Sequence, residues 1–176
     1  MTERPSSDAP ATPATPAAEL LTSLDAVQSR LEDHASSPLS VGLTDPDPPT
    51  GERWDWGQVW AHLGEFVPYW SAQVRLIMET EGEGPVPFGR TKKDPVRIAA
   101  IEADRHRPPA ELMARLASHL EELRALIREL RDEDWKRRGV HLTLGVMEMP
   151  AIFHEFLVGH LESHVSQLDG LGARGS

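Results

Sequence analysis

Two histidines placed four residues apart, His160 and His164, are the side chains whose type and spacing point most directly to chemistry. On a helix, residues at this spacing lie one above the other, about 5–6 Å apart at Cβ. At 100° per residue, Phe153 and Leu157 fall on the same side, so both imidazoles occupy a seam where aliphatic side chains are expected. Unpaired imidazoles are costly to bury, and two neighbouring rings can each offer a nitrogen to one cation. The pair therefore predicts a metal site, provided that another segment supplies a further ligand.

His62 is the best candidate for that ligand, because it falls on the apolar face of another predicted helix, between Val59 and Phe66. Three neutral imidazoles suit Zn²⁺ or Ni²⁺, with iron as a further option, and they leave at least one coordination position open. Two histidines at this spacing are by themselves more often a surface or core pair whose hydrogen bonds are satisfied without a metal. The addition of His62 therefore favours a divalent metal bound by His62, His160 and His164.

Other histidines compete for this role. His119 lies on the apolar face of a predicted third helix, where a lone histidine is more often a hydrogen-bonded core residue than a fourth ligand or a wall of the site. His34, His106 and His141 fall at predicted helix ends or in loops and are expected to be solvated. His154 lies beside a second apolar stripe on the last helix, which either a partner subunit, the first helix or residues 38–51 would cover.

Two polar residues follow the predicted ligands at helical spacing. Glu65 comes three residues after His62, and Gln167 comes three residues after His164. Either can orient an imidazole or act as a base, because a ligating imidazole usually donates its second nitrogen to a neighbour. Plain solvent exposure is the slightly favoured alternative for both. The sequence assigns no catalytic residue.

Four long amphipathic segments must position these side chains. They cover about residues 16–34, 55–82, 109–131 and 150–169, and the second opens with Asp55 and Gln58, the pattern of a capping box. A long connection over residues 86–109 has room for a short helix near 95–105, and no strand-like alternation competes with the helices. The pattern predicts an all-α, four-helix bundle over residues 15–170, preceded by a flexible, disordered tail at residues 1–14.

Composition excludes several classes of protein. The net charge of −10 and the pI near 5.2 argue against nucleic acid as a partner. With no cysteine in its 176 residues, the chain has no disulfide, no thiolate ligand and no cysteine nucleophile, so any thiol chemistry needs a small-molecule thiol. No apolar run approaches the length of a membrane span. A cytoplasmic protein without a membrane partner is expected.

Residues 59–63 (VWAHL) and 159–168 (GHLESHVSQL) resemble the DinB/YfiT-like superfamily, which includes the N-terminal domain of mycothiol-dependent maleylpyruvate isomerase. The resemblance covers about residues 16–168 and departs at Met149-Pro150, where Thr or Ser is common. It implies that His62, His160 and His164 are the metal triad. It also implies an up-down-down-up bundle with a long crossover, frequent homodimers, and bacillithiol or mycothiol S-transferase activity in several members.

Three functions follow as expectations. The first is a metal-dependent enzyme of S-transferase or isomerase type, which activates a low-molecular-weight thiol toward an electrophilic substrate. The second is a metal-dependent hydrolase that uses bound hydroxide. The third is a stress-associated, metal-binding homodimer without turnover.

Overall fold

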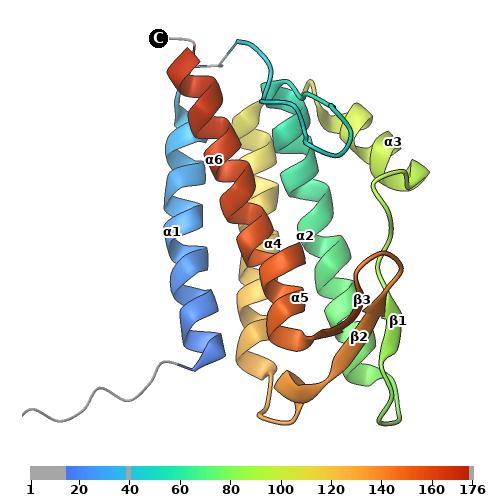
Figure 1. The fold of residues 1–176 in the computed structure, drawn as a ribbon. Coiled ribbons are helices and arrows are strands. Elements are labelled where there is room, and N and C mark those ends of the chain that lie inside the picture. The colour runs from blue at the N-terminus through green and yellow to red at the C-terminus, as the bar shows by residue number, and fades with distance from the viewer. Residues whose placement is uncertain (1–14, 39–40, 175–176) are drawn as a thin grey trace, which may run out of the picture.

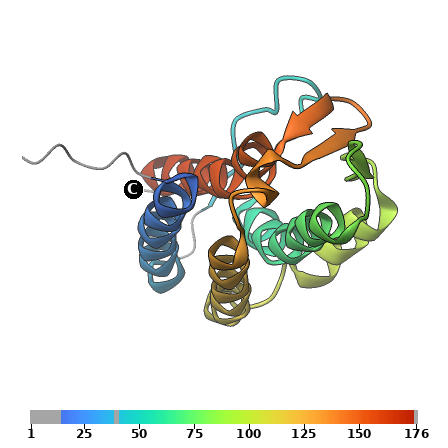
Figure 2. The same cartoon turned by 90° about the horizontal axis from the view of Figure 1, so that it is seen from below.

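The computed structural model describes residues 15–38 and 41–174 and shows a four-helix bundle with a small sheet at one end (Figure 1). The predicted tail at residues 1–14 lies outside the described residues. The bundle helices are α1 (Pro16–Ser36), α2 (Trp56–Glu79), α4 (Pro109–Glu129), and a fourth made of α5 (Met149–Phe156) and α6 (Val158–Arg174). Both α1 and α2 pack against α4 and α6, so the four close a ring around the core (Figure 2).

The helices run up, down, down and up, as predicted (Figure 1). Because α2 and α4 run in the same direction, the chain must travel back along the bundle between them. That crossover carries a strand, β1 (Val86–Phe88), and a short helix, α3 (Pro95–Asp104), which packs on α2. The short helix predicted near residues 95–105 is confirmed. The crossover is important for the site because it brings a segment of cationic residues alongside α2.

Side chains cap the first two bundle helices, and the cap of α2 is the predicted one. Thr15 accepts a hydrogen bond from the backbone N–H of Ala18 at 3.3 Å and begins α1. Asp55 accepts from the backbone of Gln58 at 2.8 Å, and the Gln58 side chain accepts from the backbone of Asp55 at 3.0 Å. This reciprocal pair fixes where α2 begins. It therefore also fixes which face of the helix His62 occupies.

The sequence did not predict the sheet. Strand β2 (Arg138–His141) pairs in parallel with β1 and antiparallel with β3 (Gly145–Glu148), and a 3₁₀ turn at Asp134–Lys136 precedes it. Strands of three or four residues are too short for alternation to identify them. The parallel pairing also joins the crossover to the segment after α4, and no local sequence pattern predicts such a contact between distant segments. The sheet packs beside α2 and α5.

The last helix was predicted to be continuous, and the structure shows it interrupted. Leu157 has φ −126° and ψ −89° and separates α5 from α6. Beyond the break, a Cβ added to Gly159 would lie 2.4 Å from the carbonyl oxygen of His154, a contact that real side chains do not make. Glycine at this position therefore permits the close approach of the two turns. The break at Leu157 lies three residues before His160.

The second apolar stripe of the last helix is buried within this chain. Val158, Leu161 and Val165 are all buried, and α1 packs on α6. Burial against the first helix is thus sufficient, and the stripe does not require a partner subunit. In the part of the chain that the structure describes, no helix is both long and apolar enough to cross a membrane.

Candidate metal centre

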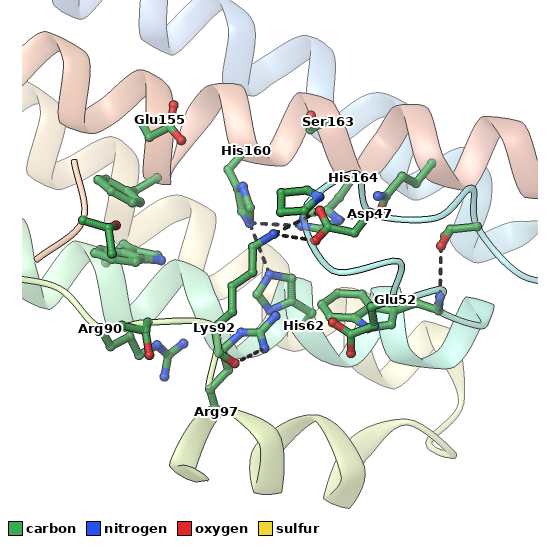
Figure 3. A pocket seen from close by; sticks show the side chains of 18 of the residues that line it. Asp47, Glu52, His62, Arg90, Lys92, Arg97, Glu155, His160, Ser163 and His164 are labelled. Atoms are coloured by element: carbon green, nitrogen blue, oxygen red, sulfur yellow. Dashed lines mark hydrogen bonds and ion pairs between the residues drawn. The ribbon is translucent and has the colours of Figure 1, made fainter. Parts of the chain in front are cut away.

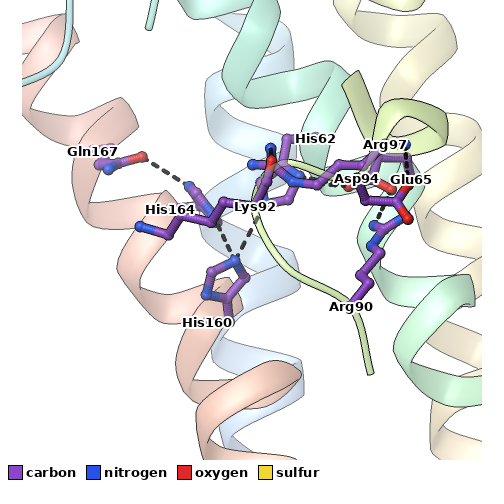
Figure 4. Close-up of polar contacts among 9 residues, drawn as sticks. All are labelled: His62, Glu65, Arg90, Lys92, Asp94, Arg97, His160, His164 and Gln167. Carbon is purple, nitrogen blue, oxygen red and sulfur yellow. Dashed lines mark hydrogen bonds and ion pairs between the residues drawn. The ribbon is translucent and has the colours of Figure 1, made fainter. Parts of the chain in front are cut away.

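The three predicted ligands meet in the bundle interior (Figure 4). His62 comes from α2, and His160 and His164 come from successive turns of α6. Nε2 of His160 lies 3.2 Å from Nε2 of His62 and 3.1 Å from Nε2 of His164. His62 and His164 are 4% and 6% exposed, and His160 is half-buried. Among the described residues, these three form a group whose nitrogens could hold one ion.

Glu65 and Gln167 set the orientation of two of these rings. Nδ1 of His62 donates to Oε1 of Glu65 at 2.7 Å, and Nδ1 of His164 donates to Oε1 of Gln167 at 2.8 Å. The slight preference for solvent exposure was wrong for both residues, because each hydrogen-bonds a ring. With the proton on Nδ1, the Nε2 atom of each ring carries a lone pair that faces the centre.

The donor set fits a divalent cation. A proton on Nε2 of His160 can bridge toward one neighbouring Nε2 but not toward both, so one buried lone pair is left facing another nitrogen. Leaving such a buried acceptor unsatisfied is costly. One cation would satisfy all three nitrogens together. Three protein ligands with further coordination positions open are typical of catalytic rather than structural zinc sites.

The rings are suited to be neutral ligands. Burial, followed by the charges that His164 and His160 would carry, lowers the pKa of His62 well below its ordinary value. Burial likewise lowers the pKa of His160 well below its ordinary value, and that of His164 to about 4. The imidazoles are therefore neutral at neutral pH, so metal binding would not have to remove the second proton of an imidazolium.

A network of charges lies behind His62. Glu65 accepts a hydrogen bond from Arg90 through Oε2, and its Oε1 lies 3.9 Å from Nε of Arg97 (Figure 4). The guanidinium of Arg90 also stacks 3.8 Å from the ring centroid of Tyr69. Burial raises the pKa of Glu65 above its ordinary value, against the opposing effect of Arg90. Glu65 thus links a candidate ligand to the crossover segment.

The three imidazoles form part of the wall of a cavity of about 760 Å³ (Figure 3). Trp54, Trp70 and Phe156 provide aromatic surface to this cavity. Charged residues from three segments also line it: Asp45, Asp47, Glu52, Arg90, Lys92, Arg97 and Glu155. This volume is in the range of ordinary ligand-binding sites. The open side of the triad can therefore receive a small molecule.

His141 was expected to be solvated, and this was wrong. It lies in β2, is buried, and contributes to the cavity wall. Its Nδ1 accepts from the hydroxyl of Thr143 at 3.1 Å, and its Nε2 donates to the carbonyl oxygen of Arg90 at 3.4 Å. Its ring packs against Phe156 at a centroid distance of 4.9 Å. Only the pairing of the short strands brings His141 to the cavity, so the sequence held no signal for it.

The remaining histidines lie away from the triad. His119 is a partly exposed residue of α4, with Nδ1 3.8 Å from Oε2 of Glu122, and it is neither a fourth ligand nor a core residue. His106 and His154 are exposed. Nε2 of His34 contacts Oδ1 of Asp169 at 2.7 Å, so this residue joins α1 to α6 instead of being merely solvated.

Comparisons with known proteins agree with this picture. Residues 23–168 match the family model described as the DinB superfamily. Among solved structures, the chain is similar to YfiT from Bacillus subtilis, described as a probable metal-dependent hydrolase with an unusual four-helix bundle topology. The two align with a TM-score of 0.67 and 18% identity, over 98% of this chain and 93% of that one, which shows a shared fold. No curated protein sequence matches.

Proposed function

The chain belongs to the DinB superfamily, and on this basis we propose that it is a metal-dependent enzyme that activates a low-molecular-weight thiol toward an electrophilic substrate. The observation that carries the proposal is the convergence of three imidazole Nε2 atoms on the wall of a cavity. His62, His160 and His164 would hold zinc, nickel or iron.

The chemistry follows from the charge of the ligands. A divalent cation bound by neutral imidazoles keeps its double charge, which lowers the pKa of a bound thiol or water toward neutrality. Glu65 and Gln167 hold the rings of His62 and His164 with Nε2 toward the centre. The rigid placement of these rings matters because ligands held in advance need no reorganisation when the ion binds.

Two features favour a thiol as the activated group. The chain has no cysteine, so a sulfur nucleophile must come from solution. The cavity of about 760 Å³ has room for both a small thiol and an electrophile. Its aromatic surface at Trp54, Trp70 and Phe156 suits the apolar part of either molecule.

The proposal is tested on protein prepared without an affinity tag, because a tag can retain nickel. Elemental analysis gives the bound metal, and consumption of a chromogenic electrophile is followed with glutathione, bacillithiol or mycothiol. Replacement of His160 by alanine should abolish both metal retention and thiol-dependent turnover. The matched control is His154→Ala, since His154 is an exposed histidine of the preceding helix. Unchanged turnover in His160→Ala would reject the proposal.

The second candidate is hydrolysis by metal-activated water, supported by the description of YfiT as a probable metal-dependent hydrolase. The same three histidines would hold the ion in both cases. Turnover of an ester or amide without any added thiol, lost in His160→Ala, would favour hydrolysis over thiol transfer.

A further inference from the structure

One cationic side chain of the cavity wall extends toward the three histidines. The side chain of Lys92 extends from the crossover toward His160 and His164 (Figures 3 and 4). Its Nζ donates to both carboxylate oxygens of Asp47, at 3.0 and 2.9 Å. Burial is the main cause of the lowered pKa values of His160 and His164, and the positive charges of Arg97 and Lys92 add to it. Lys92 therefore lies where a molecule bound to the ion would meet it.

The backbone that carries Lys92 is held on two sides. Before it, the N–H of Gly89 donates to Oε1 of Gln73 at 2.7 Å, and the φ of Gly89 is +90°, a conformation that favours glycine. Behind it, the buried Arg97 donates from Nη1 to the carbonyl oxygen of Lys92 at 3.0 Å. The backbone position is thus fixed, and the long side chain alone is free to move.

The partner of Lys92 can be exchanged, in contrast to the partner of Arg90. The side chains of Lys92 and Asp47 are 59% and 31% exposed, and an exposed ion pair of this kind contributes little net free energy. Arg90 and Glu65 are almost completely buried, so their pair is costly to separate. A carboxylate on an incoming molecule can therefore replace Asp47 at Lys92.

The other charges of the cavity restrict where that carboxylate can lie. Asp45, Glu52 and Glu155 also line the cavity and would repel an anion placed beside them. The charges of Arg90 and Arg97 are already opposed by the Glu65 carboxylate. An anionic group is consequently best placed beside Lys92, close to the triad.

We propose that Lys92 binds a carboxylate of the thiol cosubstrate, in exchange for Asp47, and so selects thiols that carry a carboxylate within a few bonds of the sulfur. This inference rests on the proposed thiol function and names its cosubstrate class. Lys92 acts here as a substrate-binding residue, and Asp47 holds the ammonium in place when the cavity contains no thiol.

The test measures binding to protein loaded with cobalt(II), whose absorption reports a coordinated thiolate. The two probes are 3-mercaptopropionate, which carries a carboxylate, and 2-mercaptoethanol, which is neutral. At low ionic strength the wild type should bind 3-mercaptopropionate roughly three- to tenfold more tightly than 2-mercaptoethanol. In Lys92→Met the ratio should fall to about one, the value expected without a local charge effect.

Two further variants complete the test. Lys93→Met removes the same charge from the next residue, whose exposed side chain does not line the cavity. This variant should leave the ratio unchanged. Asp47→Asn removes the competing carboxylate and should tighten binding of 3-mercaptopropionate. Loss of cobalt binding in Asp47→Asn would instead identify Asp47 as a metal ligand and overturn the exchange.

Failure of the inference and failure of the proposed function give different results. If both thiols coordinate with equal affinity in the wild type, or if Lys92→Met keeps the preference, selection by Lys92 is wrong while the thiol function stands. If cobalt binds and neither thiol produces the thiolate absorption, the thiol function itself is rejected.

Discussion

Replacing Glu65 with glutamine tests whether the residues behind the triad control metal binding. The carboxylate of Glu65 accepts from Nδ1 of His62 at 2.7 Å through one oxygen and from Arg90 through the other. Arg97 lies 3.9 Å from the first oxygen. The side chain is 11% exposed, so solvent screens these interactions only weakly. Glutamine keeps the size and an acceptor oxygen but removes the charge.

The expected losses differ between metal affinity and stability. Removing the charged partner of a ligating imidazole typically weakens metal binding about 10- to 100-fold, or about 1.4–2.7 kcal/mol. Breaking a fully buried ion pair costs about 3–5 kcal/mol. Because the glutamine oxygen still accepts one hydrogen bond, we expect about 1–3 kcal/mol of destabilisation of the metal-free protein.

Competition with a chromophoric zinc chelator measures the affinity, and urea unfolding of the metal-free protein measures the stability. Glu79→Gln is the matched control, because Glu79 is an exposed residue of the same helix. Should Glu65→Gln bind zinc as tightly as Glu79→Gln does, the proposed role of Glu65 in orienting His62 would be wrong.

Three other predictions follow from the same structure. Gly159→Ala would place a Cβ 2.4 Å from the carbonyl oxygen of His154 and should lower the free energy of unfolding, measured by urea titration, by about 1–3 kcal/mol. The control Gly84→Ala, whose Cβ would meet nothing within 4 Å, should change it by less than about 0.5 kcal/mol. Burial alone would raise the pKa of Asp169, but hydrogen bonds from α1 side chains, including His34, hold it below its ordinary value of 3.8, so the stabilisation is present above pH 3.8 and lost as the pH falls through the folded pKa. Because the side chain is 48% exposed, Asp169→Asn should be less stable than the wild type at pH 7 by only about 0.5 kcal/mol. The difference should vanish at low pH in acid unfolding curves. Removal of the metal with a chelator should lower the melting temperature, and re-addition of zinc should raise it again with the logarithm of the free zinc concentration. A melting temperature that does not respond to zinc would contradict binding to the folded state.

The individual helices and the candidate ligands could be predicted from the sequence because their signals are local. A cap, a run of apolar residues every three or four positions and a stop signal together define a helix within its own segment. The same periodicity put His62, His160 and His164 on apolar faces, where an imidazole is out of place without a partner. Asp55 and Gln58 form the capping box that their spacing predicted.

The surroundings of the ligands could not be read in this way, because they depend on contacts between distant segments. The pairing of β1 with β2 buried His141, and the crossover placed Arg90 against Glu65 and Lys92 beside the triad. The interruption at Leu157 separates α5 from α6, and each of these helices packs against other elements of the chain.

The sequence by itself thus determined the helices and the imidazoles that they carry, since a helix repeats on a scale of a few residues and leaves its period in the chain. Only the tertiary structure decided which cations meet Glu65 and the rings, and what cavity they share. Those contacts join residues that are far apart in the chain, and no periodic pattern encodes the distance between them.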